Sequence, residues 1–247
     1  YLKYYENQVL EDWYELIRHI SVSETGEGIE TCCDWIQKKM EEIGIQVTKY
    51  SVKPAPVLVG RFGNDPEKKT VLIYAHYDVK PAGERKLWHS DPFVPTVRDG
   101  KVYARGSADN KSPLMAHLKA LEYFVRKKME VPVNVIFVFE GDEECGSRGL
   151  EEFLAEHRTE LAADLVFFSD GPKDPSGLPI IALGAKGDLS VHITVETMNR
   201  NVHARYAPVL PSAAWQLVEI LGKCKSKDKI LIPGFVGRNI TFYRKRN

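Results

Sequence analysis

The chain has 247 residues, which is enough for one large domain or for one domain and part of a second. Hydrophobic residues make up 43% of the chain and charged residues 28%, as in ordinary soluble globular proteins. The 34 basic side chains balance the 34 acidic ones, which excludes the overall basic field of a nucleic-acid-binding protein, and no apolar run is long enough to cross a membrane.

Helical and strand-like patterns alternate along the first two thirds of the chain. Apolar side chains at helical spacing predict a helix over residues 5–20 and a second over 23–44, with Ser23 or Thr25 as its cap and Gly44 as its stop. Strands are predicted next in residues 45–52, 56–63 and 68–79, followed by a short strand and a polar loop in 99–113. The remaining predictions are a helix in 114–128, a strand and an acidic loop in 131–147, a helix in 148–158 and a strand in 163–172.

Three of these strands are continuous apolar runs, in 68–79, 131–147 and 163–172. Such runs are typical of central strands that are covered on both faces. Because strands alternate with helices, we expect an α/β domain with a mostly parallel central sheet flanked by helices.

The pattern changes near residue 188. Residues 187–199 alternate like an amphipathic strand, and residues 211–225 have the spacing of a helix. We therefore expect a first domain over residues 1–187 and the start of a second, α+β domain over 188–247.

Polar side chains follow each of the three apolar strands, and a further carboxylate precedes the long helix. These residues are His76 and Asp78, then Glu140, Glu143 and Glu144, then Asp170, and finally Asp109. In open α/β sheets the functional crevice lies at the carboxyl ends of the strands. Imidazole and carboxylates bind hard or borderline metal ions, and carboxylates packed this closely repel one another without a cation. A lone strand-end Asp is more often structural, but the coincidence of these groups predicts a metal site.

Four segments that carry these residues resemble the signature blocks of the M20 metallopeptidases, which are co-catalytic zinc exopeptidases. The segments are HYDVKPAG (76–83), YARGSADNKSP (103–113), FEGDEECGS (139–147) and FFSDG (167–171). They occur in the family's order, and the first two are most similar to its cytosolic dipeptidase and carnosinase branch. The resemblance implies a zinc-exopeptidase-like catalytic domain, of which residues 1–187 are the N-terminal part, and a partial lid and dimerisation domain in residues 188–247.

Carried over residue by residue, the resemblance implies two metal ions. His76 and Asp170 would be ligands of the first ion, Glu144 would be a ligand of the second, and Asp109 would bridge the two. Two Zn²⁺ ions are expected, with Mn²⁺ or Co²⁺ as alternatives.

The resemblance also implies the reaction, which is hydrolysis of a peptide bond in dipeptides or short peptides. Glu143 matches the general base that takes a proton from a metal-bridging water, and it should diverge from its neighbour Glu144. Asp78 matches the carboxylate that fixes His76. In related dipeptidases a lid histidine reaches the partner subunit's active site, and His203 has a comparable place here, although HARYAPVLP replaces the usual His-Ser-Gly block. A homodimer through the lid is implied as well.

The family's second metal takes a further histidine from late in the chain, but no histidine follows His203 here. We expect that residue beyond position 247 rather than a natural truncation, because a partial lid would expose apolar surface. Three alternatives stay open: a carboxypeptidase, an N-acyl amino-acid deacylase, and a defective relative that binds metal only structurally. The four cysteines show no disulfide-type spacing and no signal-peptide pattern opens the chain, so we expect a cytoplasmic location.

Overall fold

The computed structural model describes residues 2–171, 174, 176–178, 180–182, 187 and 190–235. The chain divides into two compact units, Tyr1–Pro179 and Ile180–Asn247. Among the described residues, no helix combines the length and the apolar character that crossing a membrane requires.

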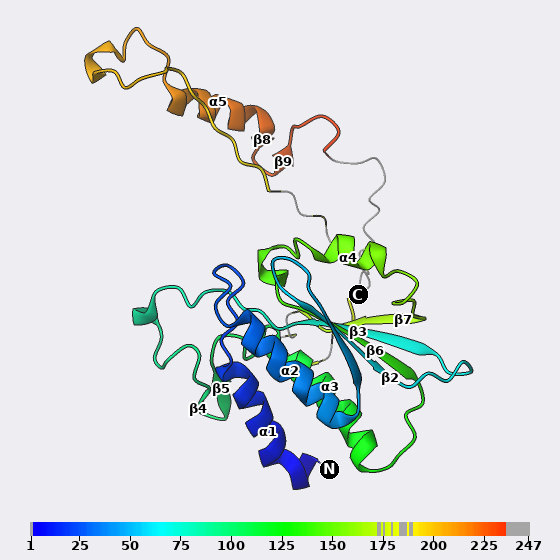
Figure 1. Cartoon of the computed structure of the whole chain (residues 1–247). Coiled ribbons are helices and arrows are strands. Elements are labelled where there is room, and N and C mark those ends of the chain that lie inside the picture. Colours follow the sequence, from blue (N-terminus) through cyan, green and yellow to red (C-terminus); the bar gives the residue numbers. More distant parts are fainter. Residues whose placement is uncertain are drawn as a thin grey trace. The chain divides into compact units, whose positions relative to one another are not determined.

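A five-stranded mixed sheet forms the middle of the first unit (Figure 1), with the strand order β1-β2-β6-β3-β7. The strands are β1 Gln46–Tyr50, β2 Val57–Phe62, β3 Thr70–His76, β6 Asn134–Glu140 and β7 Leu165–Phe168. β3 pairs in parallel with both β6 and β7, whereas β2 pairs antiparallel with both β1 and β6. The predicted α/β class is confirmed. Parallel pairing is confined to the strands around β3. β1 and β2 are antiparallel, as their short connection requires, and β2 also pairs antiparallel with β6.

Helices cover both faces of this sheet. They are α1 Leu2–Arg18, α2 Ile29–Ile43, α3 Lys111–Arg126 and α4 Leu150–Glu156. Figure 1 shows α1, α2 and α3 together on one face, where Met40 and Leu118 pack against Phe137 of β6. On the other face Phe153 of α4 packs against Val138. Alternate residues of β6 therefore enter two separate cores, as the period of a strand requires. A small hairpin of β4 Thr96–Arg98 and β5 Lys101–Tyr103 and the short helix η1 Arg85–Leu87 lie between β3 and α3 in the chain.

The start of α2 differs from the prediction. The helix begins at Ile29 with Gly28 as its N-cap, rather than at Ser23 or Thr25. Residues 22 and 27 instead pair across a tight turn. Gly28 has a φ of 71°, and a Cβ there would lie 2.0 Å from the carbonyl oxygen of Ile20, so only glycine fits this close approach. The predicted stop at Gly44 is confirmed, since Gly44 caps the helix in the left-handed conformation.

The predicted burial of β7 is wrong. All seven residues of β6 are buried, but all four residues of β7 are exposed, including Phe168 at 57%. β7 pairs with β3 alone, and among the described residues no strand pairs with its other edge. An apolar run predicts a strand that can be buried, but its actual burial depends on what packs against it.

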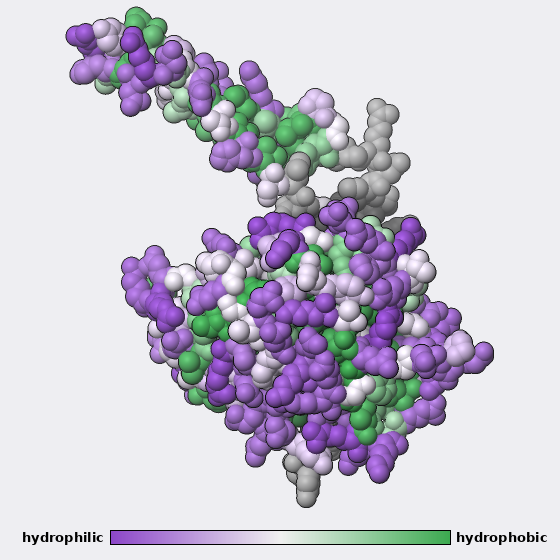
Figure 2. Space-filling model, viewed as in Figure 1, coloured by the Kyte–Doolittle hydropathy of each residue, from purple (hydrophilic) through white to green (hydrophobic). Residues whose placement is uncertain are grey.

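The second unit contains one longer helix, α5 Ala213–Cys224, as predicted from the spacing in 211–225. It also contains the short helix η3 Ala204–Tyr206 and the hairpin of β8 Lys225–Ser226 and β9 Lys229–Ile230. The strand predicted in residues 187–199 is wrong for the residues that the structure describes there, because they form no strand. The apolar side chains of that segment, such as Val191, are exposed, and so is Trp215 of α5 at 70%. Figure 2 shows hydrophobic side chains gathered over part of α5.

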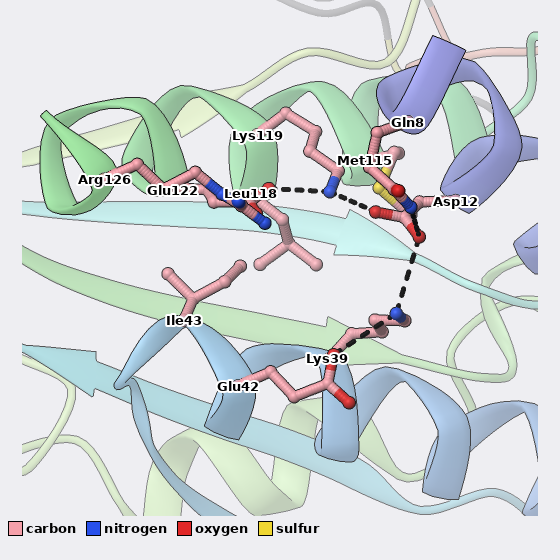
Figure 3. Close-up of a pocket in the computed structure, with 10 residues that line it drawn as sticks. All are labelled: Gln8, Asp12, Lys39, Glu42, Ile43, Met115, Leu118, Lys119, Glu122 and Arg126. Carbon is pink, nitrogen blue, oxygen red and sulfur yellow. Dashed lines mark hydrogen bonds and ion pairs between the residues drawn. The ribbon is translucent and has the colours of Figure 1, made fainter. Parts of the chain in front are cut away.

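Ion pairs fasten α1 to the rest of the first unit. Asp12 of α1 points into a polar cavity of about 250 Å³, where it is paired with both Lys39 of α2 and Lys119 of α3 (Figure 3). Lys119 continues the chain of contacts to Glu122, whose other oxygen accepts from Arg126. Burial alone would raise the pKa of Asp12, but the two lysines outweigh this effect and hold that pKa below its ordinary value.

The stabilising effect of Asp12 should therefore depend on pH. A lowered pKa in the folded state means that the contribution is complete above pH 3.8, the ordinary value for Asp, and is lost as pH falls further. We expect Asp12→Asn to lower the free energy of unfolding by about 2 kcal/mol at pH 7, because two half-buried lysines lose the buried carboxylate that they share. The difference from the wild type should shrink on acidification to pH 3, as measured by urea unfolding.

Asp34 provides a matched control, since it pairs with Lys49 but is 63% exposed. We expect Asp34→Asn to change the free energy of unfolding by less than about 1 kcal/mol. An equal loss of unfolding free energy in both variants, or a loss in Asp12→Asn that does not depend on pH, would contradict a role for the ion pairs of Asp12.

Candidate metal centre

The parallel part of the sheet brings the ends of three strands to one edge. In the register of β3 and β6, His76 lies opposite Glu140, and in that of β3 and β7, Tyr74 lies opposite Phe168. The segments that leave β6 and β7 therefore both begin beside His76, the last residue of β3. This is the edge at which the sequence predicted a site.

Three side chains meet at this edge, and we call them the His76 cluster: His76, Asp109 and Asp170. The Nε2 atom of His76 lies 3.1 Å from Oδ1 of Asp109 and 3.2 Å from Oδ2 of Asp170. One potential ligand atom from each residue lies within 4.8 Å of the other two. Within the described part of the chain, no other set of three His, Cys, Asp or Glu side chains meets this condition. One imidazole and two carboxylates suit a zinc, manganese or cobalt ion.

Asp78 lies behind this cluster and is fully buried. Its Oδ1 atom is 3.3 Å from Nδ1 of His76, and its backbone carbonyl oxygen is 3.1 Å from the same nitrogen. The carboxylate also accepts hydrogen bonds from the backbone N–H groups of Glu143 and Glu144, at 3.2 and 3.1 Å. Those residues open the short helix η2 Glu143–Cys145. Asp78 therefore fixes the direction of the imidazole and the start of η2 together, as expected for a carboxylate behind a ligand.

Hydrogen bonds hold the pKa of Asp78 below its ordinary value. Burial alone would raise that pKa, because it disfavours the charged form. The contacts with His76, with the Ser23 hydroxyl and with the backbone of Glu144 outweigh burial. Ser23 was not among the predicted site residues, since a serine in a turn carries no sequence signal that it will meet Asp78.

Glu143 stands close to the cluster without joining it. Its Oε2 atom lies 3.8 Å from Nε2 of His76, which is beyond hydrogen-bonding distance. Burial raises the pKa of Glu143, and the neighbouring negative charges of Glu144, Asp170 and Asp78 raise it further against the opposing effect of His76. A carboxylate with a raised pKa beside an open group of ligands can accept and return a proton.

Glu144 is not part of the His76 cluster and contacts a lysine instead. Its Oε2 atom lies 3.4 Å from Nζ of Lys80, which also donates to the backbone carbonyl oxygen of Glu144. The structure therefore does not bring Glu144 together with His76. Lys80 was not among the predicted site residues, and its partner could not be predicted from its place in the sequence.

His203 belongs to the second unit. It is exposed and precedes η3, where its Nδ1 atom accepts a hydrogen bond of 3.2 Å from the backbone N–H of Arg205. Its catalytic role stays a prediction.

Two further contacts at this edge carry no clear sequence signal. Tyr74 shares a face of β3 with His76, and its hydroxyl donates a 2.5 Å hydrogen bond to Oε1 of the buried Glu140. Lys111 follows the loop that carries Asp109, is 1% exposed, and donates to the carbonyl oxygen of Leu16 at 3.1 Å near the end of α1. This buried contact ties the start of α3, which follows the Asp109 loop, to the end of α1.

The negative charge around His76 fits a bound cation. Burial alone would lower the pKa of His76, but Asp78, Glu143 and Asp109 outweigh burial and raise that pKa to about 9. At neutral pH a proton on His76 therefore balances part of the surrounding charge. A divalent cation held by the same nitrogen and the two carboxylates would replace that proton.

The structure predicts that Asp78→Asn will affect both His76 and η2. The variant keeps one oxygen but places an amide where the second oxygen accepts a backbone N–H, so we expect the free energy of unfolding to fall by about 3 kcal/mol. We also expect the pKa of His76 to fall below about 9, because the carboxylate that raises it most is gone. Urea unfolding and an NMR titration of the metal-free protein measure the two effects.

Asp99→Asn is a suitable control, since Asp99 lies in the exposed turn between β4 and β5. It should leave both quantities unchanged. An unchanged pKa of His76 in Asp78→Asn would contradict the proposed coupling of these two residues.

A family model and similar proteins of known sequence place this chain in the same peptidase family. Residues 72–244 match the sequence model described as "Peptidase family M20/M25/M40". The Cys-Gly metallodipeptidase dug1 of Schizosaccharomyces pombe is 37% identical over 206 residues, which are 80% of this chain and 43% of that protein. The Beta-Ala-His dipeptidase of Homo sapiens is 35% identical over 183 residues, which are 72% of this chain and 36% of that protein. The chain thus spans less than half the length of these relatives.

A solved structure that is named as a member of the M20 family is also similar to this chain. The M20 family metallo-carboxypeptidase Sso-CP2 from Sulfolobus solfataricus superposes with a TM-score of 0.84 at 33% identity. The match covers 92% of this chain and 52% of the other.

Proposed function

Because the chain belongs to peptidase family M20/M25/M40, we propose that it carries the metal-binding part of a hydrolase that cleaves the peptide bond of dipeptides or short peptides. The resemblance seen in the sequence is thereby confirmed at the level of the family. The single observation that supports the activity is the His76 cluster, in which one imidazole and two carboxylates converge at the carboxyl ends of parallel strands.

Four residues would hold two metal ions in this proposal. His76 and Asp170 would bind the first ion, Glu144 would bind the second, and Asp109 would bridge both. When bound, two such ions polarise a scissile carbonyl group and acidify a water molecule. Glu144 would have to exchange its contact with Lys80 for the second ion. Zn²⁺ is the expected metal, with Mn²⁺ or Co²⁺ as alternatives.

The residues of the chain would supply orientation and proton transfer. Asp78 holds Nδ1 of His76, which leaves Nε2 directed at Asp109 and Asp170. Glu143 would accept the proton of the attacking water and return it to the leaving amine, and its raised pKa favours that exchange. His203 would support the developing oxyanion in the partner subunit of a lid-mediated dimer.

The names of the relatives support a proposal for the substrate class. The names of two relatives specify Cys-Gly and Beta-Ala-His dipeptides, whereas the solved structure is named as a carboxypeptidase. We infer a dipeptidase, with a carboxypeptidase or N-acyl amino-acid deacylase as the alternative. These activities share the metal groups and differ in how the substrate is held.

Metal content and hydrolysis together test the proposed function. A protein that extends past residue 247 to include the expected second-metal histidine is loaded with Zn²⁺ or Mn²⁺. Its metal content is measured by mass spectrometry, and it is assayed with free dipeptides, blocked peptides and N-acyl amino acids. We expect two ions per chain and hydrolysis of free dipeptides that a chelator abolishes. One ion or none, with no hydrolysis of any of these compounds, would support a purely structural metal site instead.

Glu143 provides a sharper test of the mechanism. We expect Glu143→Ala to keep its metal content and to lose turnover by a factor of about 10²–10⁴, because general acid–base catalysis contributes that much. Glu152→Ala is the control, since Glu152 is an exposed residue of α4 and should retain full turnover. Turnover by Glu143→Ala at the wild-type rate would remove Glu143 from the role of base.

A further inference from the structure

A hydrogen bond joins α3 to the end of β7, next to the His76 cluster. The Nε2 atom of His117, on α3, lies 2.7 Å from the hydroxyl oxygen of Ser169. The imidazole also meets the ring of Phe167 edge to face, with 5.4 Å between centroids. Both His117 and Ser169 are half-buried, so water competes less with this hydrogen bond than it would at an exposed site.

The segment that this bond holds carries one member of the cluster. Ser169 directly precedes Asp170, whose carboxylate lies 3.2 Å from Nε2 of His76. Within the part of the chain that the structure describes, β7 itself gives this segment weak support, because its four residues are exposed and it pairs with β3 alone. The backbone register with β3 ends at Phe168, so Ser169 and Asp170 lie beyond the last paired residue.

α3 has a fixed position relative to the other carboxylate of the cluster. The helix begins at Lys111, directly after Asp109 and Asn110. The side chains of Leu114 and Leu118 are buried in the core beneath the sheet, so the helix is firmly packed. One firmly packed helix therefore begins two residues after Asp109 and contacts Ser169, the residue next to Asp170.

We propose that His117 is a positioning residue of the metal centre, which acts through Ser169 to hold Asp170 against His76. The proposal rests on the proposed function, because it assigns His117 a role in metal binding. His117 does not touch a metal ligand, and its ring fixes the segment rather than the carboxylate. Without the bond, the end of an exposed edge strand would sample several conformations, and the three ligands would be assembled for less of the time.

Substitutions of His117 separate the hydrogen bond from the space that the ring fills. Gln places an amide group close to the position of Nε2, so His117→Gln should preserve the bond to Ser169. Phe preserves a ring of similar shape against Phe167 but has no polar atom, so His117→Phe should lose the bond. Ser169→Ala removes the other partner, and Ser169→Thr retains the hydroxyl group.

Metal affinity is the first readout, measured by competition between the protein and a fluorescent chelator for Zn²⁺. We expect His117→Phe and Ser169→Ala each to weaken binding about tenfold, as the loss of an outer partner of a metal ligand does. His117→Gln and Ser169→Thr should bind as the wild type does. The double variant His117→Phe with Ser169→Ala should be no weaker than either single variant, because both remove the same bond.

His157→Phe provides a matched control. His157 is also half-buried, stacks on Phe153 at 4.4 Å, and contacts the Phe153 carbonyl oxygen at 3.0 Å on the α4 side of the sheet. We expect His157→Phe to leave Zn²⁺ affinity unchanged. Wild-type affinity in His117→Phe, or additive losses in the double variant, would overturn the proposal.

Amide hydrogen exchange in the metal-free protein distinguishes failure of this inference from failure of the proposed function. We expect the amides of residues 167–170 to exchange about tenfold faster in His117→Phe than in the wild type or in His117→Gln. If the wild type binds no Zn²⁺, the proposed function fails whatever the exchange rates are. If it binds Zn²⁺ but exchange and affinity are both unaffected in His117→Phe, only the role of His117 fails.

Discussion

One buried carboxylate, Asp78, is the constraint on which the site depends. It is shielded from water at the end of β3, and such a charge is stable only when its oxygens are fully bonded. His76 meets it on one side, and the N–H groups of Glu143 and Glu144 meet it on the other. The contacts of this one carboxylate thus determine which nitrogen of the imidazole faces Asp109 and Asp170, and where η2 begins.

The same negative charges have two effects in this arrangement. Around His76 they raise the pKa to about 9, which makes the imidazole a place where positive charge is favoured. Around Glu143 they act with burial to raise the pKa of a carboxylate that stands just outside the cluster. The same charged residues therefore produce both a cation site and a proton acceptor beside it.

The elements that hold the site differ in how firmly they are packed. β6 is buried along its whole length, and α3 is packed by its apolar face and by Lys111, which contacts the end of α1. Among the described residues, β7 is exposed and paired on one side only, yet it leads into Asp170. The geometry of the cluster is thus most sensitive at β7, where side-chain contacts have to replace the support that a central strand receives from its neighbours.

Local patterns in the sequence determined the elements and the types of ligand. The apolar runs and helical spacings predict the strands and helices of the first unit. The polar residues at the strand ends, with Asp109 before the long helix, predict the cluster of His76, Asp109 and Asp170, because parallel strands end at one edge. Tertiary structure alone decided the exposure of β7, the absence of a strand among the described residues of 187–199, the contact of Glu144 with Lys80, and the bond between His117 and Ser169. These depend on what lies across space from a residue, and periodicity along the chain carries no information about that.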